Sequence, residues 1–203
     1  MKVAFIGAGT HVLSVLDSLN NEYEVVGVYD NLLQEDTFYG IKKLGGLRDF
    51  VNQRELYDAI MITLGDITMR EELLTLVKEN AIPMFSVIDE SAIVSTTATI
   101  AEGTFVGKCA VVNAYATIGE ACILNTGCVV EHGCELGKNV HVAPNATLCG
   151  NVYVEDHVLL GAASCVIQSL KICSHAFVGA SACVCKNIDR AGIYVGVPAR
   201  MVK

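Results

Sequence analysis

Aliphatic residues recur at every sixth position through the second half of the chain. From Val94 to Val184 this register holds sixteen residues, and each of them is Val, Leu or Ile. An α-helix repeats every 3.6 residues and a strand every two, so neither produces a six-residue period. A sustained hexapeptide repeat is the signature of a parallel β-helix whose aliphatic residues fill the interior. We therefore predict a β-helix here.

The residues around this register fit the same structure. Two positions before each aliphatic residue lies mostly a small one, and the position after it is often glycine, which we expect to ease the turn (Gly107, Gly119, Gly137, Gly161 and Gly179). The chain is 52% hydrophobic but only 6% aromatic and contains no Trp. Three of its nine cysteines, Cys122, Cys128 and Cys134, are six residues apart. This spacing favours small buried hydrophobes over disulfides or metal ligands.

The overall charge and hydropathy exclude two classes of partner. The formal net charge of −8 leaves no basic stripe for nucleic acid. No apolar run is long enough for a membrane span, and the opening MKVAFIGAG leads into a helical pattern rather than a signal-peptide cleavage site. We expect a cytoplasmic protein without nucleic-acid or membrane partners.

The first part of the chain follows a different pattern, in which strand and helix signals alternate. KVAFIG, EVVGVYD and AIMITLG read as buried strands, VLSVLDSLN and REELLTLVKEN read as helices, and Asp66 is placed to cap the second helix. This alternation predicts a small βαβ domain with a parallel sheet. We place it at residues 1–84, with the β-helix at residues 85–203.

A glycine-rich loop follows the first strand and opens the first helix. Gly7 and Gly9 match a dinucleotide fingerprint, but Val12 replaces its third glycine, which disfavours NAD. The amides at the start of a helix can still bind a phosphate group.

Three motifs give the chain a family resemblance. GAGTH near the start, NTGCVVEHG at residues 125–133 and GVPAR near the end together resemble the PglD/NeuD family of sugar acyltransferases. The resemblance implies a small Rossmann-like βαβ domain followed by a left-handed parallel β-helix with three hexapeptides per coil. It also implies a homotrimer that transfers an acetyl group from acetyl-CoA. The implied acceptor is a nucleotide-linked amino sugar, such as a UDP-4-amino-4,6-dideoxy sugar, in surface glycan or glycoprotein synthesis.

The resemblance also implies the roles of particular residues. His132 matches the general base, with Glu131 and Asn125 beside it in the motif, and His141 matches a contact to acetyl-CoA. The other CoA contacts match Ala162 and Ala180. The positions that match the nucleotide-sugar site lie in three loops of the first domain (Gly9, Thr10, His11, Asp30, Asn31 and Gly65).

Three hexapeptides per coil would stack residues that are 18 apart, about 4.8 Å from one another. Gly150 then lies over His132, and Gly179 and Ala180 extend a strip of small residues along the prism. Such a strip can hold the pantetheine arm of CoA, although small residues also suit the tight turns by themselves. We therefore predict CoA binding by His141, Gly150, Ala162, Gly179 and Ala180.

His132 is expected to point outward at a corner, where only a neighbouring subunit could form a cleft around it. Histidine titrates near neutral pH and can take a proton from an attacking amine. The best-known amino-sugar acetylating members carry an acidic residue directly after this histidine, whereas this chain has Gly133. Either Glu131 or a carboxylate of the neighbouring subunit must then support the imidazole.

The remaining histidine pair, His157 and His175, is also 18 residues apart and should stack at one corner. A zinc site shared across a trimer would need a third ligand, and the sequence offers none at suitable spacing. We expect two solvated corner histidines and no metal.

Two alternatives to N-acetylation are O-acetylation of a sialic-acid-like sugar and a non-catalytic trimeric scaffold. The presence of Asn125, Glu131, His132, His141 and the first loop disfavours the scaffold.

Overall fold

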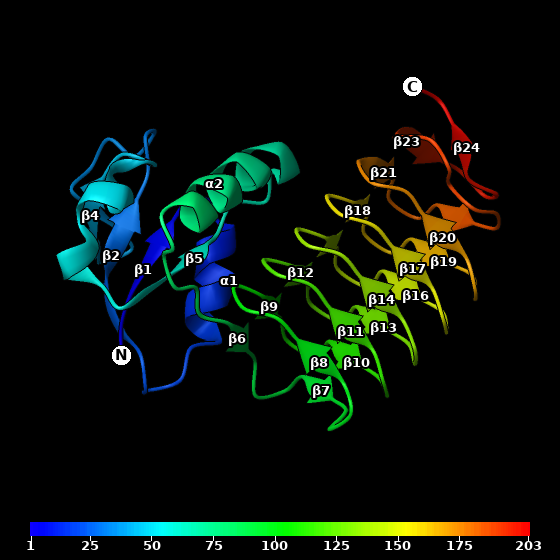
Figure 1. Cartoon of the computed structure of the whole chain (residues 1–203), viewed down its shortest axis with the longest axis horizontal. Coiled ribbons are helices and arrows are strands. Elements are labelled where there is room, and N and C mark those ends of the chain that lie inside the picture. Colours follow the sequence, from blue (N-terminus) through cyan, green and yellow to red (C-terminus); the bar gives the residue numbers. More distant parts are fainter.

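The computed structural model covers all 203 residues and contains a front domain beside the first coils of a β-helix (Figure 1). The front domain is a five-stranded sheet in the order β3-β4-β2-β1-β5. Its elements are β1 (Lys2–Ile6), α1 (His11–Asp17), β2 (Glu24–Tyr29), β3 (Thr37–Phe38), β4 (Ile41–Gly45), the 3₁₀ turns η1 (Asp49–Asn52) and η2 (Arg54–Leu56), β5 (Ala59–Ile62) and α2 (Ile67–Glu79). No helix is both long and apolar enough to cross a bilayer.

The three predicted strands and both predicted helices are present, and the Asp66 side chain caps α2 by accepting a hydrogen bond of 2.8 Å from the Met69 amide. The sequence prediction missed the β3–β4 hairpin. Strand β4 runs parallel to β2, and β3 pairs antiparallel with β4 through a turn at Tyr39 and Gly40, both at positive φ. Strand β3 has only two residues, too few to show a periodic pattern.

The β-helix is a three-sided prism, and each side is a parallel sheet of very short strands. The first face contains β7 (Ile93–Val94), β10 (Val111–Val112), β13 (Val129–Val130), β16 (Thr147–Leu148), β19 (Cys165–Val166) and β22 (Cys183–Val184). The second face contains β8 (Thr99–Ile100), β11 (Thr117–Ile118), β14 (Glu135–Leu136), β17 (Tyr153–Val154) and β20 (Lys171–Ile172).

The third face contains β6 (Val87–Ile88), β9 (Phe105–Val106), β12 (Ile123–Leu124), β15 (His141–Val142), β18 (Leu159–Leu160), β21 (Ala176–Val178) and β23 (Gly192–Val195), with β24 (Arg200–Met201) antiparallel at its end. We call the turn between the first and second faces the first corner. The turn between the second and third faces is the second corner, and the turn between the third and first faces is the third corner.

Every pairing along the prism has the predicted 18-residue register, as in Val111 with Val129 and Ile123 with His141. The aliphatic register from Val106 to Val184 is buried in one continuous core, and Val94 and Ile100 pack against that core at the first coils. Cys122, Cys128 and Cys134 belong to the same core, and all nine cysteines are free thiols. Their predicted role as small hydrophobes is therefore confirmed.

The expected role of the glycines was wrong. The residues at positive φ lie three positions after each aliphatic residue, so they form a different six-residue series (Gly103, Cys109, Tyr115, Ala121, Gly127, Gly133, Asn139, Asn145, Asn151, His157, Ala163, Ser169, His175 and Ser181). The glycines directly after the aliphatic residue are needed for close approach instead. A Cβ on Gly119 would lie 2.4 Å from the Gly137 carbonyl oxygen of the next coil.

The front domain packs against the third face. A core that includes α1 and one side of the front sheet extends over the outward side chains Phe105 and Ile123. A second core, which includes α2, extends to Ala121 at the second corner. The next outward side chain in the row after Ile123 is His141. The packing therefore places His141 at the boundary between the two domains.

We expect Gly119→Ala to destabilise the β-helix by about 1–3 kcal/mol, since the new methyl group has no space between adjacent coils. Denaturant unfolding measures the change. The matched control is Gly9→Ala, where no atom lies within 4 Å of the added Cβ and a change within about 0.5 kcal/mol is expected. Equal stability of the two variants would show that the coils can separate at no cost.

Candidate functional site

His132 is exposed at the first corner, in the turn between β13 and β14, as predicted. Gly150 lies over it in the next coil. A Cβ on Gly150 would be 2.5 Å from the imidazole Cε1 and 2.6 Å from Nε2, so only glycine leaves room for the ring. The predicted stacking of Gly150 over His132 is confirmed, and it gives this glycine a steric role beside the imidazole.

Glu131 faces the main chain. Its carboxylate oxygen Oε2 accepts the hydrogen bond of the His132 backbone amide at 3.1 Å, and this is its one hydrogen bond. Gly133 has a φ of +65°, and a Cβ there would meet the Asn151 Oδ1 at 2.4 Å. Within one chain, therefore, Glu131 holds the turn rather than the imidazole, and Gly133 meets a backbone and packing requirement of the corner.

Asn125 lies at a different corner from His132. It is in the turn between β12 and β13, which is the third corner, and its Oδ1 accepts the Thr126 amide at 2.8 Å. A full prism face separates it from the Glu131–His132 turn. The three residues that the motif groups together in sequence are therefore not one cluster within the chain.

The predicted CoA contacts are divided in the same way. Ala162, Gly179 and Ala180 lie together at the third corner, where the two alanines are exposed and Gly179 is buried. Gly161, in the same column as Gly179, approaches the next coil so closely that a Cβ would lie 2.6 Å from the Ala180 nitrogen. The strip of small residues therefore exists at this corner, whereas Gly150 belongs to the first corner and His141 to the third face.

His141 is held at the domain boundary without a hydrogen-bond partner. Both of its ring nitrogens are buried and unpaired. Burial, with a further contribution from the Arg70 charge and from His11, lowers the pKa of His141 to about 3, while the nearby Gly65 main chain opposes this decrease. The ring is therefore neutral at physiological pH, with one N–H to donate and one lone pair to accept.

His11 and Arg70 accompany His141. His11 packs edge-on against Phe105, with ring centroids 5.3 Å apart, and burial together with the Arg70 charge lowers its pKa to about 4. Arg70 is fully buried, and its Nη2 donates to the Ala121 carbonyl, while Nε and Nη1 have no partner. Burial lowers its pKa to about 10, so the guanidinium stays charged at neutral pH.

The sequence reasoning missed Arg70. It opens the REELL stretch of an amphipathic helix, where a charged residue normally faces solvent. No sequence signal marks it as buried, because its burial depends on how α2 packs against the β-helix.

The other predicted sugar-site residues line the loops that follow the parallel strands β1, β2 and β5. Gly9, Thr10, Asn31 and Gly65 are exposed, and no atom lies within 4 Å of a Cβ on Gly9 or Gly65. Asp30 is nearly buried because its carboxylate accepts the amides of Ala8, Leu32 and Leu33 at 2.6–3.0 Å. Asp30 therefore ties two loops together, and the open space lies around the glycines.

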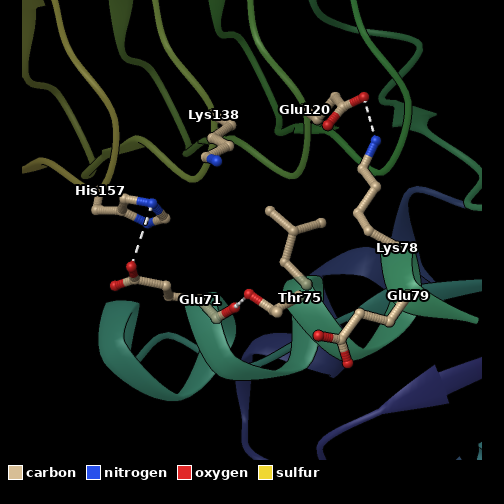
Figure 2. A pocket seen from close by; sticks show the side chains of 8 residues that line it. Glu71, Thr75, Lys78, Glu79, Glu120, Lys138 and His157 are labelled. Atoms are coloured by element: carbon tan, nitrogen blue, oxygen red, sulfur yellow. Dashed lines mark hydrogen bonds and ion pairs between the residues drawn. The ribbon is translucent and has the colours of Figure 1, made fainter.

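The prediction for His157 and His175 was half right. Their rings stack as expected, 5.0 Å apart and 12° from parallel. His157, however, is only 8% exposed, because α2 covers the second corner and places Glu71 beside it. Figure 2 shows these residues in a cavity of about 370 Å³ between α2 and the coils. No group of three His, Cys, Asp or Glu side chains is arranged to hold a metal ion.

The prism geometry has one consequence for catalysis. His132 lies at the first corner, which is opposite the third face, and His141 projects from that third face. The core of the β-helix lies between them. A reaction that uses both histidines therefore needs His132 from one subunit and His141 from another.

We expect Arg70→Met to raise the pKa of both His141 and His11, since the positive charge that disfavours their protonation is removed. The increase should be partial, because burial is the larger cause. NMR titration of the imidazole carbon-bound protons measures it. Arg70→Lys keeps the charge and should leave both pKa values low; an equal increase in both variants would mean that packing, rather than charge, controls these rings.

Comparison with known proteins gives matches in both domains. Residues 2–77 match the family described as PglD N-terminal domain, and residues 115–150 match the family described as bacterial transferase hexapeptide (six repeats). A 2,3,4,5-tetrahydropyridine-2,6-dicarboxylate N-acetyltransferase from Staphylococcus aureus is 31% identical over 75 residues, which are 33% of this chain and 31% of that enzyme. The chain thus spans about a third of the length of this curated relative.

Solved structures match over the whole length. A histidine-to-asparagine variant of perosamine N-acetyltransferase from Caulobacter crescentus, in complex with CoA and GDP-perosamine, has a TM-score of 0.94 and 28% identity, covering 100% of this chain and 97% of that one. The acetyltransferase domain of PglB from Neisseria gonorrhoeae, in complex with acetyl coenzyme A, has a TM-score of 0.91 and 26% identity, covering 99% and 98%. In its motifs, its two family matches and its full-length fold, the chain is of the PglD/NeuD sugar acyltransferase type, as the sequence resemblance implied.

Proposed function

We propose that this protein is an N-acetyltransferase that moves the acetyl group of acetyl-CoA to a nucleotide-linked amino sugar. A sugar of the UDP-4-amino-4,6-dideoxy class, used in surface glycan or glycoprotein synthesis, is our expected acceptor. The observation that carries the proposal is the full-length similarity to an enzyme bound to CoA and a nucleotide amino sugar, together with the unpaired His141 at the domain boundary. We place the reaction in the cytoplasm, where nine free thiols stay reduced.

The chain's own residues fit the two ligands. At the third corner the exposed Ala162 and Ala180 leave the main chain open to a thin pantetheine arm. The open loops at Gly9 and Gly65 offer backbone amides to a nucleotide. The unpaired ring nitrogens of His141 lack an acceptor that a thioester carbonyl oxygen would supply.

The proposed chemistry assigns one task to each histidine. His132 accepts the proton that the sugar amine must lose as its nitrogen bonds to the acetyl carbonyl carbon. His141, kept neutral by burial and by Arg70, donates its N–H to the carbonyl oxygen, where negative charge develops. The thiol of CoA leaves as the carbon–sulfur bond breaks, and the proton held by His132 is available to it.

The proposed assembly is a homotrimer in which each active site lies between two subunits. This follows from the opposite placement of His132 and His141 on the prism. The neighbouring subunit also becomes the expected source of a carboxylate near His132, since Glu131 faces its own main chain.

We expect His132→Ala and His141→Ala each to lower kcat/KM by about 10²–10⁴-fold, because each removes a proton-transfer or charge-stabilising group. Mixed one to one after unfolding and refolding together, the two inactive proteins should regain activity at about a quarter of the sites, those that pair an intact His132 with a neighbour's intact His141. A steady-state acetylation assay measures the recovery. A double variant mixed with inactive single variants is the control, and no recovery in the mixture would place both histidines in one subunit or remove one from the mechanism.

Ligand stabilisation tests the substrate class. UDP-, GDP-, dTDP- and CMP-linked amino sugars are compared in a thermal-shift assay with and without CoA, and a ligand at 100 times its Kd stabilises the native state by about 2.7 kcal/mol. We expect a UDP-linked amino sugar to raise Tm, and Gly65→Val to remove the effect. A rise only with a CMP-linked sialic-acid-like sugar would favour O-acetylation, and no rise with any sugar or with CoA would favour a scaffold.

A further inference from the structure

Helix α2 is docked along the second corner by a row of polar contacts that joins the two domains. At its C-terminal end Lys78 pairs with Glu120 and lies 3.8 Å from Glu102. In its middle Arg70 donates to the Ala121 carbonyl. At its N-terminal end the contacts are made by Ile67 and Glu71, and Figure 2 shows Glu71 reaching to His157 across the cavity.

The contacts at the N-terminal end form one hydrogen-bonded unit. Asn139, at a positive-φ position of the corner, donates its Nδ2 to the Ile67 carbonyl at 2.9 Å and lies 2.9 Å from Nδ1 of His157. The amide group must face Ile67 with its NH₂, because a carbonyl oxygen can only accept. Its second hydrogen then points at His157 Nδ1, which must carry a lone pair. The proton of the neutral ring is therefore on Nε2, 3.4 Å from the Glu71 carboxylate.

This unit accepts only the neutral form of His157. Protonation at Nδ1 would set one N–H against another at a buried site and would break the hydrogen bond from Asn139. The charged groups around the ring oppose each other: Glu71 and Asp156 favour the protonated form, and His175 and Lys138 disfavour it. Burial is the largest effect, and it lowers the pKa of His157 below its ordinary value of 6.5.

The unit holds a loop that borders a second cavity. Ile67 is the first residue of α2 and follows Gly65 and Asp66, which connect it to β5. Residues 65–68 form one wall of a cavity of about 400 Å³, and His157, Leu159 and His175 are on the opposite wall. Leu159 pairs in register with His141 on the adjacent strand. The position of this loop therefore sets the space beside His141.

We propose that Asn139, His157 and Glu71 form a pH-sensitive latch that fixes the loop at residues 65–67 over the site, so that these side chains are positioning residues. The part of this proposal that concerns the nucleotide sugar rests on the proposed function. In the latched state His157 is neutral. When α2 separates from the corner, His157 becomes exposed and recovers an ordinary pKa, so the open state binds a proton more readily.

The sign of the pH dependence follows from this difference. Since the open state holds more protons below pH 6.5, docking of α2 weakens as the pH falls from about 6.5 toward the lower pKa of the latched ring. Above pH 6.5 the latch is fully formed. The ratio of open to closed molecules rises about tenfold for each pH unit within that window.

Amide hydrogen exchange of residues 63–71, corrected for the intrinsic effect of pH, tests the latch in the full-length protein without ligand. Comparing pH 7.5 with pH 5.5, we expect this segment to open about tenfold more often at the lower pH. His157→Gln keeps an acceptor but cannot titrate, and it should remove the dependence. His175→Gln removes the neighbouring exposed imidazole and should preserve it.

Glu71→Gln gives a second test on an exposed side chain that is not needed for folding. It removes the charge that favours protonation of His157 in the latched state, so the opening window should extend to lower pH. Exchange that is equal at both pH values in the wild-type protein, or a dependence that persists in His157→Gln, would overturn the latch.

Calorimetric titration with the nucleotide amino sugar that gives the largest thermal shift separates this inference from the proposed function. If the latch positions the loop, the Kd should rise between pH 7.5 and pH 5.5 in the wild-type protein and much less in His157→Gln. An unchanged Kd while the segment opens would refute the positioning role. If no nucleotide sugar binds at either pH, the proposed function fails, and the exchange experiment alone decides whether the latch exists.

Discussion

The structure depends on the hydrogen bonding of each coil to the coil 18 residues further along. Strands of two residues cannot form a stable sheet by themselves, and here each is paired on both sides through the length of the prism. Adjacent coils are only about 4.8 Å apart, so the interior accepts one aliphatic side chain per side and the turns must repeat without variation. The buried register from Val106 to Val184, the positive-φ series and the close glycine contacts at Gly119 and Gly161 are three results of this one spacing.

The same repeat determines where chemistry can occur. Because interior positions are aliphatic, every polar group must lie outward, in columns on the faces or corners. His132 with Gly150, and His157 with His175, are such columns. A prism has no concave surface of its own, so a pocket arises only where another body meets it. The front domain supplies that body at the third face and second corner, and a neighbouring subunit must supply it at the first corner.

The boundary between the domains is unusually polar for a buried surface. Arg70 has no carboxylate partner, and four of the buried unpaired side-chain atoms belong to Arg70 and His141. A buried unpaired charge is costly and is seldom retained for stability. Here it accompanies two histidines that it keeps neutral, which is the state in which a ring can both donate and accept. The polar contacts of α2 thus fix the front domain and tune the groups beside the proposed site.

The sequence by itself determined the elements whose signal is local or strictly periodic. The six-residue register identified the β-helix and its core, the 18-residue arithmetic placed Gly150 over His132, and Asp66 marked the start of α2. It could not show the β3–β4 hairpin, the burial of Arg70 and His157, or the separation of Asn125 from His132. Those features depend on contacts between segments far apart in the chain. A period shows which residues point inward, but only the packing of α2 against the second corner decides which outward residues are covered, and burial then decides their charge.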